Sequence, residues 1–537
     1  MGVVVVLLVC AVVALRWLYS WLLALKKYPA GPRPLPIIGN FHQLDTAAPQ
    51  KTLKEWGDRY GPIFTVYLPR PWVFITGYDE LRAALLDNGA AAAHARLRTR
   101  QVVDCAPGVA ADAFQSRDPC PISRLVAGPK HDGVIFASGP KWKEQRRFAI
   151  TLLRNLGFGK ERMELLINNA AGILMKRLWV LSKKRNASTA GVSVDFAVEE
   201  CIANVVNSIV FGETFENNLK CFGQLRTIFA ESQRLFRQPG VLIYDNYPWL
   251  LHVPWLSEQL GLKAFVRGVT SLQAFVQARL DEHALGRGGA PDDFVSRYLQ
   301  EMTKRRSAGA NPGFFSQHQL MMVAHDLWGA GFETSTTMIK WSILFMITYP
   351  RVQDKVRREI RAVIGSRLPE AADEKLMPYT TAVLHEIRRK ANIVPINLQR
   401  RTTKDVTIGG CTLPEGAVVI PQIYNVLSDE SIFENADEFR PERFLRLDES
   451  TGATTLRQEL LSKVITFSLG SRRCLGERLA KTEHFIVLVS MLKGFTFALS
   501  PADSQPPTLA PVFGGSLQPQ PFRVALRPLP SEGTESH

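Results

Sequence analysis

One cysteine lies in a loop whose composition suits a thiolate ligand. The segment Phe467-Ser-Leu-Gly-Ser-Arg-Arg-Cys-Leu-Gly476 leads into a helical pattern. Gly470 can adopt a positive φ in a tight loop, and Gly476 leaves room for a helix to approach a flat ring. Amide dipoles at the start of that helix are expected to lower the pKa of Cys474. We therefore expect Cys474 to bind an iron ion held in a macrocycle; the alternative is a buried structural cysteine.

A second motif stands in a long helical stretch that begins at Gln317. It reads Ala330-Gly-Phe-Glu-Thr-Ser335. A mid-helix Thr334 can donate from its hydroxyl to the carbonyl of Ala330, which opens a groove in the helix. Glu333 supplies an adjacent acid for proton transfer. The alternative is a plain amphipathic helix that tolerates a glycine.

Three further patterns are weak alone, since each is also typical of surface charge. They are Glu386-Ile-Arg-Arg389 followed by Phe439-Arg-Pro-Glu-Arg-Phe444, Trp142-Lys-Glu-Gln-Arg146, and Arg400. Glu386 and Arg389 stand three apart, so they share a helix face.

In this order, with the complete pattern F-x-x-G-x-R-x-C-x-G, the motifs resemble those of the cytochrome P450 superfamily. The resemblance covers nearly the whole chain and is closest to the animal microsomal subgroup called family two. Residues 134–142, 377–379 and 401–405 carry that finer match. Two departures stand out. The segment 88–130 is longer than is usual, and Gln399 replaces a common proline.

The resemblance implies haem b as the cofactor, with the Cys474 thiolate as its axial ligand. It implies that Glu333 and Thr334 guide protons and that Glu386, Arg389 and Arg443 form a buried charge network for folding. The implied haem-binding residues are Trp142, Arg146, Ala330, Arg400, Phe467, Gly470, Arg472 and Gly476. A charge-assisted hydrogen bond from Arg472 to a carboxylate is expected.

The implied activity is that of a haem-thiolate monooxygenase that inserts one oxygen atom from O2 into small lipophilic substrates. No GxGxxG or GxxxxGK[ST] motif is present, so electrons must come from another protein. The resemblance implies NADPH-cytochrome P450 reductase as the electron donor, with cytochrome b5 as a second candidate. Basic side chains near the motifs could steer the docking of such a partner: Lys141, Lys143, Arg147 and Arg473. Two alternatives stay open: a haem-thiolate isomerase or lyase acting on peroxides, and a haem-binding membrane protein without turnover.

The amino-terminal segment is apolar enough to span a bilayer. Val3 to Leu25 has few polar residues, and about 20 apolar residues suffice for a spanning helix. Lys26 and Lys27 follow, which favours a body on the cytoplasmic side of the endoplasmic reticulum membrane. A cleaved signal peptide is the alternative. We predict an anchor at 1–27, a proline-rich linker at 28–36, a catalytic domain at 37–525 and a polar tail at 526–537.

Composition agrees with a globular body of mainly α structure and a small β lobe. The net charge of +15 favours anionic partners, but no basic tract interleaved with aromatic residues is present, so nucleic acid is excluded. Seven cysteines without a CxxC pair fit reduced thiols better than disulfides. Apolar spacing predicts helices over 165–183, 265–285, 317–347 and 351–364, strands over 63–67 and 72–76, and β structure over 406–420. The sequence does not identify the substrate or the oligomeric state.

Overall fold

A computed structural model describes most of the chain. The described residues are 2–86, 109–157, 161–184, 190–216, 218–236, 238–286, 292–307, 309, 313–448, 452–500, 502–503, 505 and 507–530. Much of the long segment 88–130 and the end of the polar tail therefore lie outside the described residues. So does Asn186-Ala-Ser188, which matches the N-x-[ST] pattern of an N-glycosylation site. The chain forms two compact units. The first comprises Met1–Asp118, Pro395–Val426 and Ser468–Arg473, and the second comprises Pro119–Val394, Leu427–Phe467 and Cys474–His537.

The first unit is built on a four-stranded sheet in the order β1-β2-β6-β3. Its helices and strands are α1 (Gly2–Leu25), α2 (Pro49–Tyr60), β1 (Ile63–Leu68), β2 (Arg70–Ile75), α3 (Tyr78–Leu85), α5 (Val109–Ala113), β3 (Arg400–Arg401), β4 (Val406–Ile408), β5 (Cys411–Leu413) and β6 (Val418–Pro421), with a short 3₁₀ turn at Phe41–Gln43; α18 (Ile423–Leu427) ends at the unit boundary. Strand β2 pairs antiparallel with β1 and parallel with β6. Leu53 and Trp56 of α2 pack on this sheet with Phe64 and Phe74.

The proline-rich segment after α1 is fastened to the sheet. The amide of Thr65 donates to the carbonyl of Ala30, and a Cβ at Gly31 would meet the Thr65 carbonyl oxygen at 1.9 Å. The side-chain amide of Asn40 donates to the carbonyl of Pro32 at 3.2 Å. The segment forms no helix, as its prolines require. It is therefore an extended arm held against β1, and it connects the sheet to α1.

The second unit is mainly helical. Its helices are α6 (Pro121–Ala127), α7 (Gly139–Asn155), α8 (Glu161–Ser182), α9 (Asp195–Phe211), α10 (Leu219–Phe236), α11 (Pro239–Asn246), α12 (Pro254–Gln259), α13 (Leu262–Ala284), α14 (Phe294–Ser307), α15 (Gln317–Thr348), α16 (Pro350–Val363), α17 (Pro378–Ala391), α19 (Gln458–Leu461) and α20 (Glu477–Gly494). Its 3₁₀ helices are Pro248–His252, Ala371–Leu376 and Pro441–Phe444. Two-stranded pairs are β7 (Leu445–Leu447) with β8 (Thr454–Leu456), β9 (Phe495–Leu499) with β12 (Val524–Pro528), and β10 (Val512–Gly514) with β11 (Ser516–Gln518).

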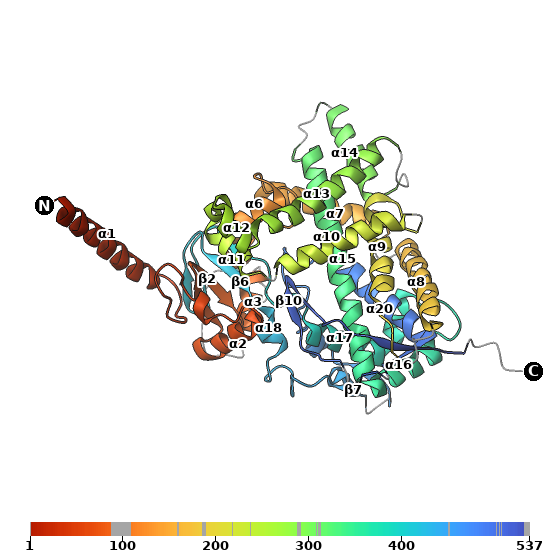
Figure 1. Ribbon diagram of the computed structural model, residues 1–537. Coiled ribbons are helices and arrows are strands. Elements are labelled where there is room, and N and C mark those ends of the chain that lie inside the picture. Colours follow the sequence, from red (N-terminus) through yellow and green to blue (C-terminus); the bar gives the residue numbers. More distant parts are fainter. Residues whose placement is uncertain are drawn as a thin grey trace, which may run out of the picture. The chain divides into compact units, whose positions relative to one another are not determined.

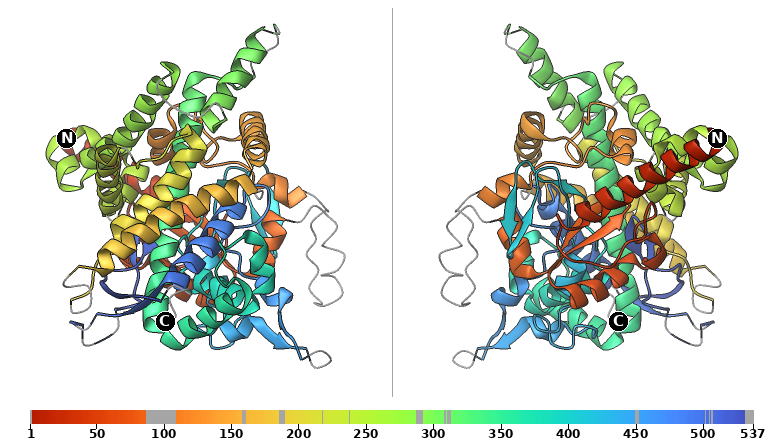
Figure 2. Two further views of the ribbon diagram at one scale, coloured as in Figure 1. Left: turned by 90° about the vertical axis from the view of Figure 1, so that its right-hand side faces the viewer. Right: turned by 90° about the vertical axis from the view of Figure 1, so that its left-hand side faces the viewer.

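Helix α15 runs through the middle of the second unit. Figure 1 shows it as the long green helix, with α9 and α20 packed against it. The left view of Figure 2 shows α8 and α20 side by side. Ser316 caps α15, since its hydroxyl accepts from the amide of Gln319 at 3.1 Å. Residues from Ile339 to Ile347 are nearly all buried, so α15 is a core helix that can hold side chains rigidly in the interior.

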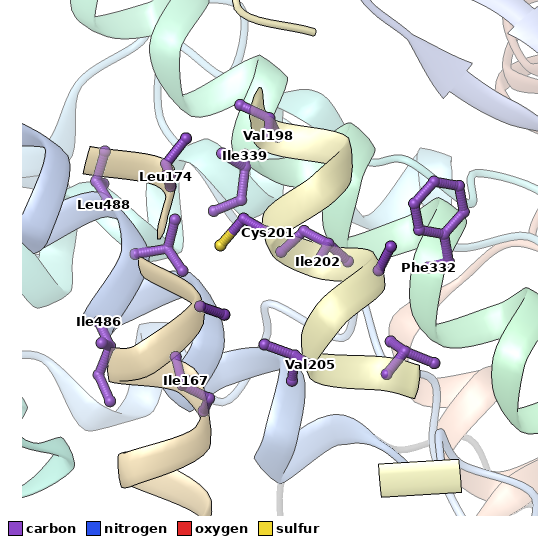
Figure 3. Close-up of a cluster of buried hydrophobic side chains, with 14 of the residues drawn as sticks. Ile167, Leu174, Val198, Cys201, Ile202, Val205, Phe332, Ile339, Ile486 and Leu488 are labelled. Carbon is purple, nitrogen blue, oxygen red and sulfur yellow. The ribbon is translucent and has the colours of Figure 1, made fainter. Parts of the chain in front are cut away.

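The core between these helices is closely packed and apolar. Figure 3 shows Cys201 of α9 with Ile339 of α15 and Leu174 of α8 around it. Cys201 is fully buried, and burial raises the pKa of its thiol well above the usual value. Cys201 is therefore a small apolar core residue rather than a reactive thiol.

The fold class predicted from the sequence is confirmed. The structure is mainly α with small sheets, and one amino-terminal helix is long and apolar enough to cross a membrane. The predicted helices correspond to α8, α13, α15 and α16 within a few residues. The predicted strands correspond to β1 and β2, and the β-rich patch to β4, β5 and β6. The single catalytic domain over 37–525 stays a prediction.

Candidate active site

Cys474 lies where the loop meets α20, as the sequence predicts. Its own amide donates to the carbonyl of Phe467 at 2.9 Å, which closes the loop. Gly476 occupies the position just before the first turn of α20, and its backbone N–H is hydrogen-bonded to the Cys474 sulfur. A Cβ at Gly476 would meet no atom within 4 Å, so the space beside the helix start is open. The Cys474 side chain is exposed on this open side.

The electrostatics at Cys474 differ in part from the expectation. Although the Cys474 side chain has a solvent-exposed side, protein surrounds most of the sulfur, and this desolvation raises the pKa of the thiol more than the Gly476 amide and Arg146 lower it. Glu477 also raises the pKa. The predicted lowering by amide dipoles is therefore present but does not dominate. A coordinated metal ion deprotonates a thiol directly, so thiolate ligation does not require a low pKa in the free side chain.

Three predicted haem contacts belong to the first unit. Gly470 has φ +76°, and a Cβ there would lie 1.9 Å from the Leu85 carbonyl oxygen, so only glycine fits. Arg472 is buried, and its Nε donates to the carbonyl of Gln115 at 2.8 Å, while a bond from Arg472 to a carboxylate stays a prediction. Arg400, in β3, is buried and donates to the carbonyl of Phe114 at 3.2 Å. Their contacts with haem stay predictions.

The hydrogen bond predicted for Thr334 is present in α15, and the groove that it would open stays a prediction. The Thr334 hydroxyl donates to the carbonyl of Ala330 at 2.7 Å, the bond expected from the sequence. Ala330 is exposed, although Trp328 and Phe332 on the same helix are buried. The turn around Ala330 therefore presents a small side chain and an open face. Trp328 itself belongs to the core, where its Nε1 donates to Asn207 at 3.3 Å.

Glu333 is held by groups from outside α15. The Ser516 hydroxyl donates to Glu333 Oε1 at 2.6 Å, and Gln233 also hydrogen-bonds this carboxylate. Burial raises the pKa of Glu333, and the two hydrogen bonds lower it. A carboxyl group with a raised pKa keeps its proton to a higher pH than a free carboxyl group does, which suits a proton-transfer role.

Trp142 and Arg146 share one face of α7. Trp142 is buried, and the Arg146 guanidinium lies 6.0 Å from the centre of its ring. Arg146 also lowers the pKa of Cys474, so its positive charge acts on the same region of the second unit. This location suits a donor to an acidic group of a cofactor bound at Cys474.

The charge network expected from the Glu386 and Arg389 spacing is present and buried. Arg389 donates from Nε and Nη2 to the two carboxylate oxygens of Glu386, each at 2.8 Å. Arg443 donates from Nε to Glu386 Oε1 at 3.1 Å. Both arginines also donate to the carbonyl of Glu438. The network joins α17 to the segment 434–443 and satisfies charges that burial would otherwise disfavour.

The residues of the second unit fit haem bound through a thiolate. Among the described residues, no three His, Cys, Asp or Glu side chains gather as a metal site. In haem, the macrocycle supplies the other ligands of an iron ion that one cysteine holds. The open side at Cys474, the small side chain of Ala330 and the lack of a side chain at Gly476 are compatible with the binding of a flat ring.

Cys411 is a poorer candidate for the ligand. It is half-buried, starts the short strand β5 and pairs with Ile408 across a two-glycine turn. Burial raises the pKa of its thiol, and no hydrogen bond to the sulfur lowers that pKa. Cys474, in contrast, has the Gly476 amide directed at its sulfur.

Sequence reasoning missed two sets of partners. Ser516 and Gln233 bind Glu333 from 183 and 100 residues away, so no local spacing indicates them. Glu483 on α20 is fully buried and hydrogen-bonds Ser335, the neighbour of Thr334. The available signal was an acidic residue two positions before the apolar run Phe485–Val489.

Comparison with known proteins agrees with this geometry. The family described as Cytochrome P450 matches residues 29–113 and 99–526. Cytochrome P450 2K1 of Oncorhynchus mykiss is 34% identical over 505 residues, which cover 93% of this chain and 91% of the relative. Cytochrome P450 2C3 of Oryctolagus cuniculus is 33% identical over 89% of this chain and 90% of its own length. Cytochrome P450 2J2 of Homo sapiens is 31% identical over 94% and 92%.

Fold and site together define a helical haem-thiolate protein of the monooxygenase class. The chain belongs to the cytochrome P450 family, and its relatives confirm the resemblance to family two. Its cofactor is haem held by a cysteine thiolate.

Proposed function

We propose that this chain is a microsomal monooxygenase with Cys474 as the axial ligand of its haem. The chain would oxidise small lipophilic substrates such as fatty acids, steroids or foreign compounds. The observation that carries the proposal is the position of Cys474 at the start of α20, with the Gly476 amide directed at its sulfur. The loop and the helix start fix the sulfur on an open side of the second unit.

Haem with a thiolate ligand supplies the chemistry, because the thiolate favours cleavage of the O–O bond. The protein positions that group and controls protons. Thr334 keeps its hydroxyl at the groove by donating to Ala330, and Glu333 holds or releases a proton beside it. Arg146 supplies positive charge close to Cys474. Trp328 and Phe332 are buried apolar side chains on the same helix and would help to exclude water from its buried face.

Electrons would come from NADPH-cytochrome P450 reductase, and cytochrome b5 is a second candidate donor. Lys143 and Arg147 are exposed on α7 and can steer an acidic partner. Lys141 is less suited to this role, since its Nζ already pairs with Asp132 at 2.6 Å. The helix α1 would anchor the protein in the endoplasmic reticulum membrane, with both units on the cytoplasmic side.

The test compares wild type with Cys474→Ser and with the matched control Cys411→Ser. Reduced wild-type protein with carbon monoxide should give the far-red-shifted Soret band of thiolate ligation, and so should Cys411→Ser. Cys474→Ser should lose the band, because a serine hydroxyl does not replace the thiolate. Retention of the band in Cys474→Ser, or its loss in Cys411→Ser, would contradict the assignment.

Turnover then separates the monooxygenase from a peroxide isomerase. The reconstituted protein should consume NADPH and O2 only when the reductase is added, and a panel of lipophiles should identify a hydroxylated product. Conversion of a hydroperoxide without reductase, together with no reductase-dependent oxygen consumption, would favour the isomerase instead.

A further inference from the structure

Glu333 is the one carboxylate of the candidate proton pathway, and two neutral donors hold it. Ser516 donates to Oε1 at 2.6 Å, a length typical of an O–H donor to an ionised acceptor. Gln233 approaches from α10. The three residues come from α10, α15 and β11, so they meet only in the folded protein.

Ser516 is positioned by a fixed hairpin. Gly515 has φ +88° and makes the turn between β10 and β11. The carbonyl of Leu517 accepts from Trp341 Nε1 at 2.9 Å, and the amide of Leu517 donates to the carbonyl of Ile393 at 2.8 Å. These bonds attach the hairpin to α15 and to the end of α17. Ser516 is only 3% exposed, so its hydroxyl cannot leave Glu333 without moving the hairpin.

Gln233 can serve Glu333 in both protonation states. Its Oε1 is buried and has no hydrogen-bond partner among the described residues, which leaves the amide nitrogen as the end that meets the carboxylate. After a half-turn of the amide, Oε1 would accept from the protonated form of Glu333. Gln233 therefore matches either a carboxylate or a carboxylic acid.

Titratable groups elsewhere on α15 and on α20, which packs against it, are engaged with other partners. Lys340 pairs with Asp195 and Glu199, Glu483 hydrogen-bonds Ser335, and His484 is hydrogen-bonded to Ser342. None of them contributes to the pKa of Glu333, for which burial, Ser516 and Gln233 are the causes. The two neutral donors are therefore the side chains that oppose the effect of burial on Glu333.

We propose that Ser516 and Gln233 are positioning residues that orient the Glu333 carboxylate for proton transfer and stabilise its ionised form between transfers. The inference rests on the proposed monooxygenase function. In each transfer Glu333 gives one proton to the reduction of O2, becomes a carboxylate that accepts from both donors, and then takes a replacement proton from solvent. The hairpin and α10 thereby control when the proton is available.

The direct test is a pH titration of Glu333 by infrared spectroscopy in the full-length haem-loaded protein. The C=O band of the protonated carboxyl is assigned by its loss in Glu333→Gln. Ser516→Ala removes a donor to the ionised form, so the titration midpoint should move up by about one pH unit, and Gln233→Leu should also move it up. Ser516→Thr keeps the hydroxyl and should stay within a few tenths of a unit of wild type.

Gln518→Ala is the matched control, because it changes the same hairpin two residues from Ser516. Its midpoint should equal that of wild type. The inference is wrong if Ser516→Ala leaves the midpoint unchanged, or if Gln518→Ala and Ser516→Thr move it as far. Gln233→Leu provides the independent reading should Ser516→Ala fail to fold.

A second measurement separates this inference from the function on which it rests. With NADPH and reductase but no added substrate, O2 is reduced to hydrogen peroxide by two electrons and two protons, or to two waters by four of each. Glu333→Gln should raise the peroxide released per NADPH several-fold, and Ser516→Ala should raise it less. An unchanged ratio in Glu333→Gln would reject the role of Glu333 itself. A changed ratio in Glu333→Gln with no midpoint shift in Ser516→Ala would reject only the positioning role.

Discussion

A single buried carboxyl makes the stability of this protein depend on pH. Glu483 is 1% exposed, and its Oε1 has no hydrogen-bond partner among the described residues. Burial raises its pKa from 4.5 to about 7, and the hydrogen bond with Ser335 lowers it only in part. The folded protein therefore keeps Glu483 protonated at a pH where the unfolded chain has already ionised it.

The direction of the effect follows from this difference. Below pH 4.5 Glu483 is protonated in both the folded and the unfolded state, so the residue does not change the free energy of unfolding. As the pH rises from about 4.5 to about 7, the unfolded state gains the ionised form first, so folding stability falls. The loss approaches about 3 kcal/mol and persists above pH 7. Glu483→Gln should remove it.

Urea unfolding at pH 5 and pH 8 measures this prediction. Wild type should lose stability between the two values relative to Glu483→Gln. Glu477→Gln, on the first turn of the same helix and only partly buried, is the control and should follow wild type. The assignment to Glu483 fails if Glu483→Gln and wild type lose equal stability over this range.

At the scale of secondary structure, the Glu386 network decides how α17 is joined to the segment before β7. Arg443 donates from Nε to Glu386 and from its other nitrogens to the carbonyls of Glu434, Asn435 and Glu438. Removing one partner of a buried pair leaves the other charge uncompensated, which costs about 3–5 kcal/mol. Arg443→Met should therefore lower the free energy of unfolding by that amount and reduce haem retention.

Arg440→Met is the matched control for this network. Arg440 precedes Arg443 by one turn, but its guanidinium pairs with the largely exposed Glu434. Exposed pairs contribute at most about 1 kcal/mol, so this variant should unfold close to wild type. If urea unfolding shows an equal loss of stability in the two variants, the buried network contributes no more to stability than an exposed ion pair does.

The elements also show which parts of the site can be predicted from sequence. The bond from Thr334 to Ala330 and the position of Cys474 before α20 depend on residues a few positions apart, so spacing was enough. The Ser516 bond to Glu333 depends on how a hairpin packs on α15, which no periodicity encodes. The same limit applies within α17. Spacing singles out Arg389, yet Arg388 is equally buried, because neighbouring helices enclose both sides.

The helices and strands that were predicted correctly also depend on patterns among residues that are close in the sequence. The strand pair β1 and β2 was predicted because prolines mark its turn, and α15 because its apolar pattern is long. The sequence did not predict that Arg472 Nε donates to the carbonyl of Gln115. Backbone acceptors are present at every residue, so a sequence pattern cannot indicate which one an arginine will meet.

At the scale of the whole molecule, α1 decides whether the protein is a membrane protein. The segment Val4–Leu25 has a mean hydropathy of 2.1, and its described side chains are largely exposed. Its 22 residues are enough to cross a hydrocarbon core. The arm at 28–36 is attached to β1, so a helix fixed in the bilayer would hold the first unit through this arm.

Deleting residues 2–27 should therefore release the protein from membranes. The full chain should stay in the pellet after alkaline carbonate extraction, because a spanning helix resists it, whereas the deleted chain should move to the supernatant. Arg16→Leu, which keeps the helix and removes its one charge, is the control and should stay in the pellet.

The topology of the protein is read from the glycosylation sequon at Asn186. If the body is cytoplasmic, endoglycosidase treatment should leave the electrophoretic mobility of the protein unchanged. A glycan at Asn186, or a mature chain that begins after Leu25, would replace the anchor with a secretory signal and place the body on the other side of the membrane.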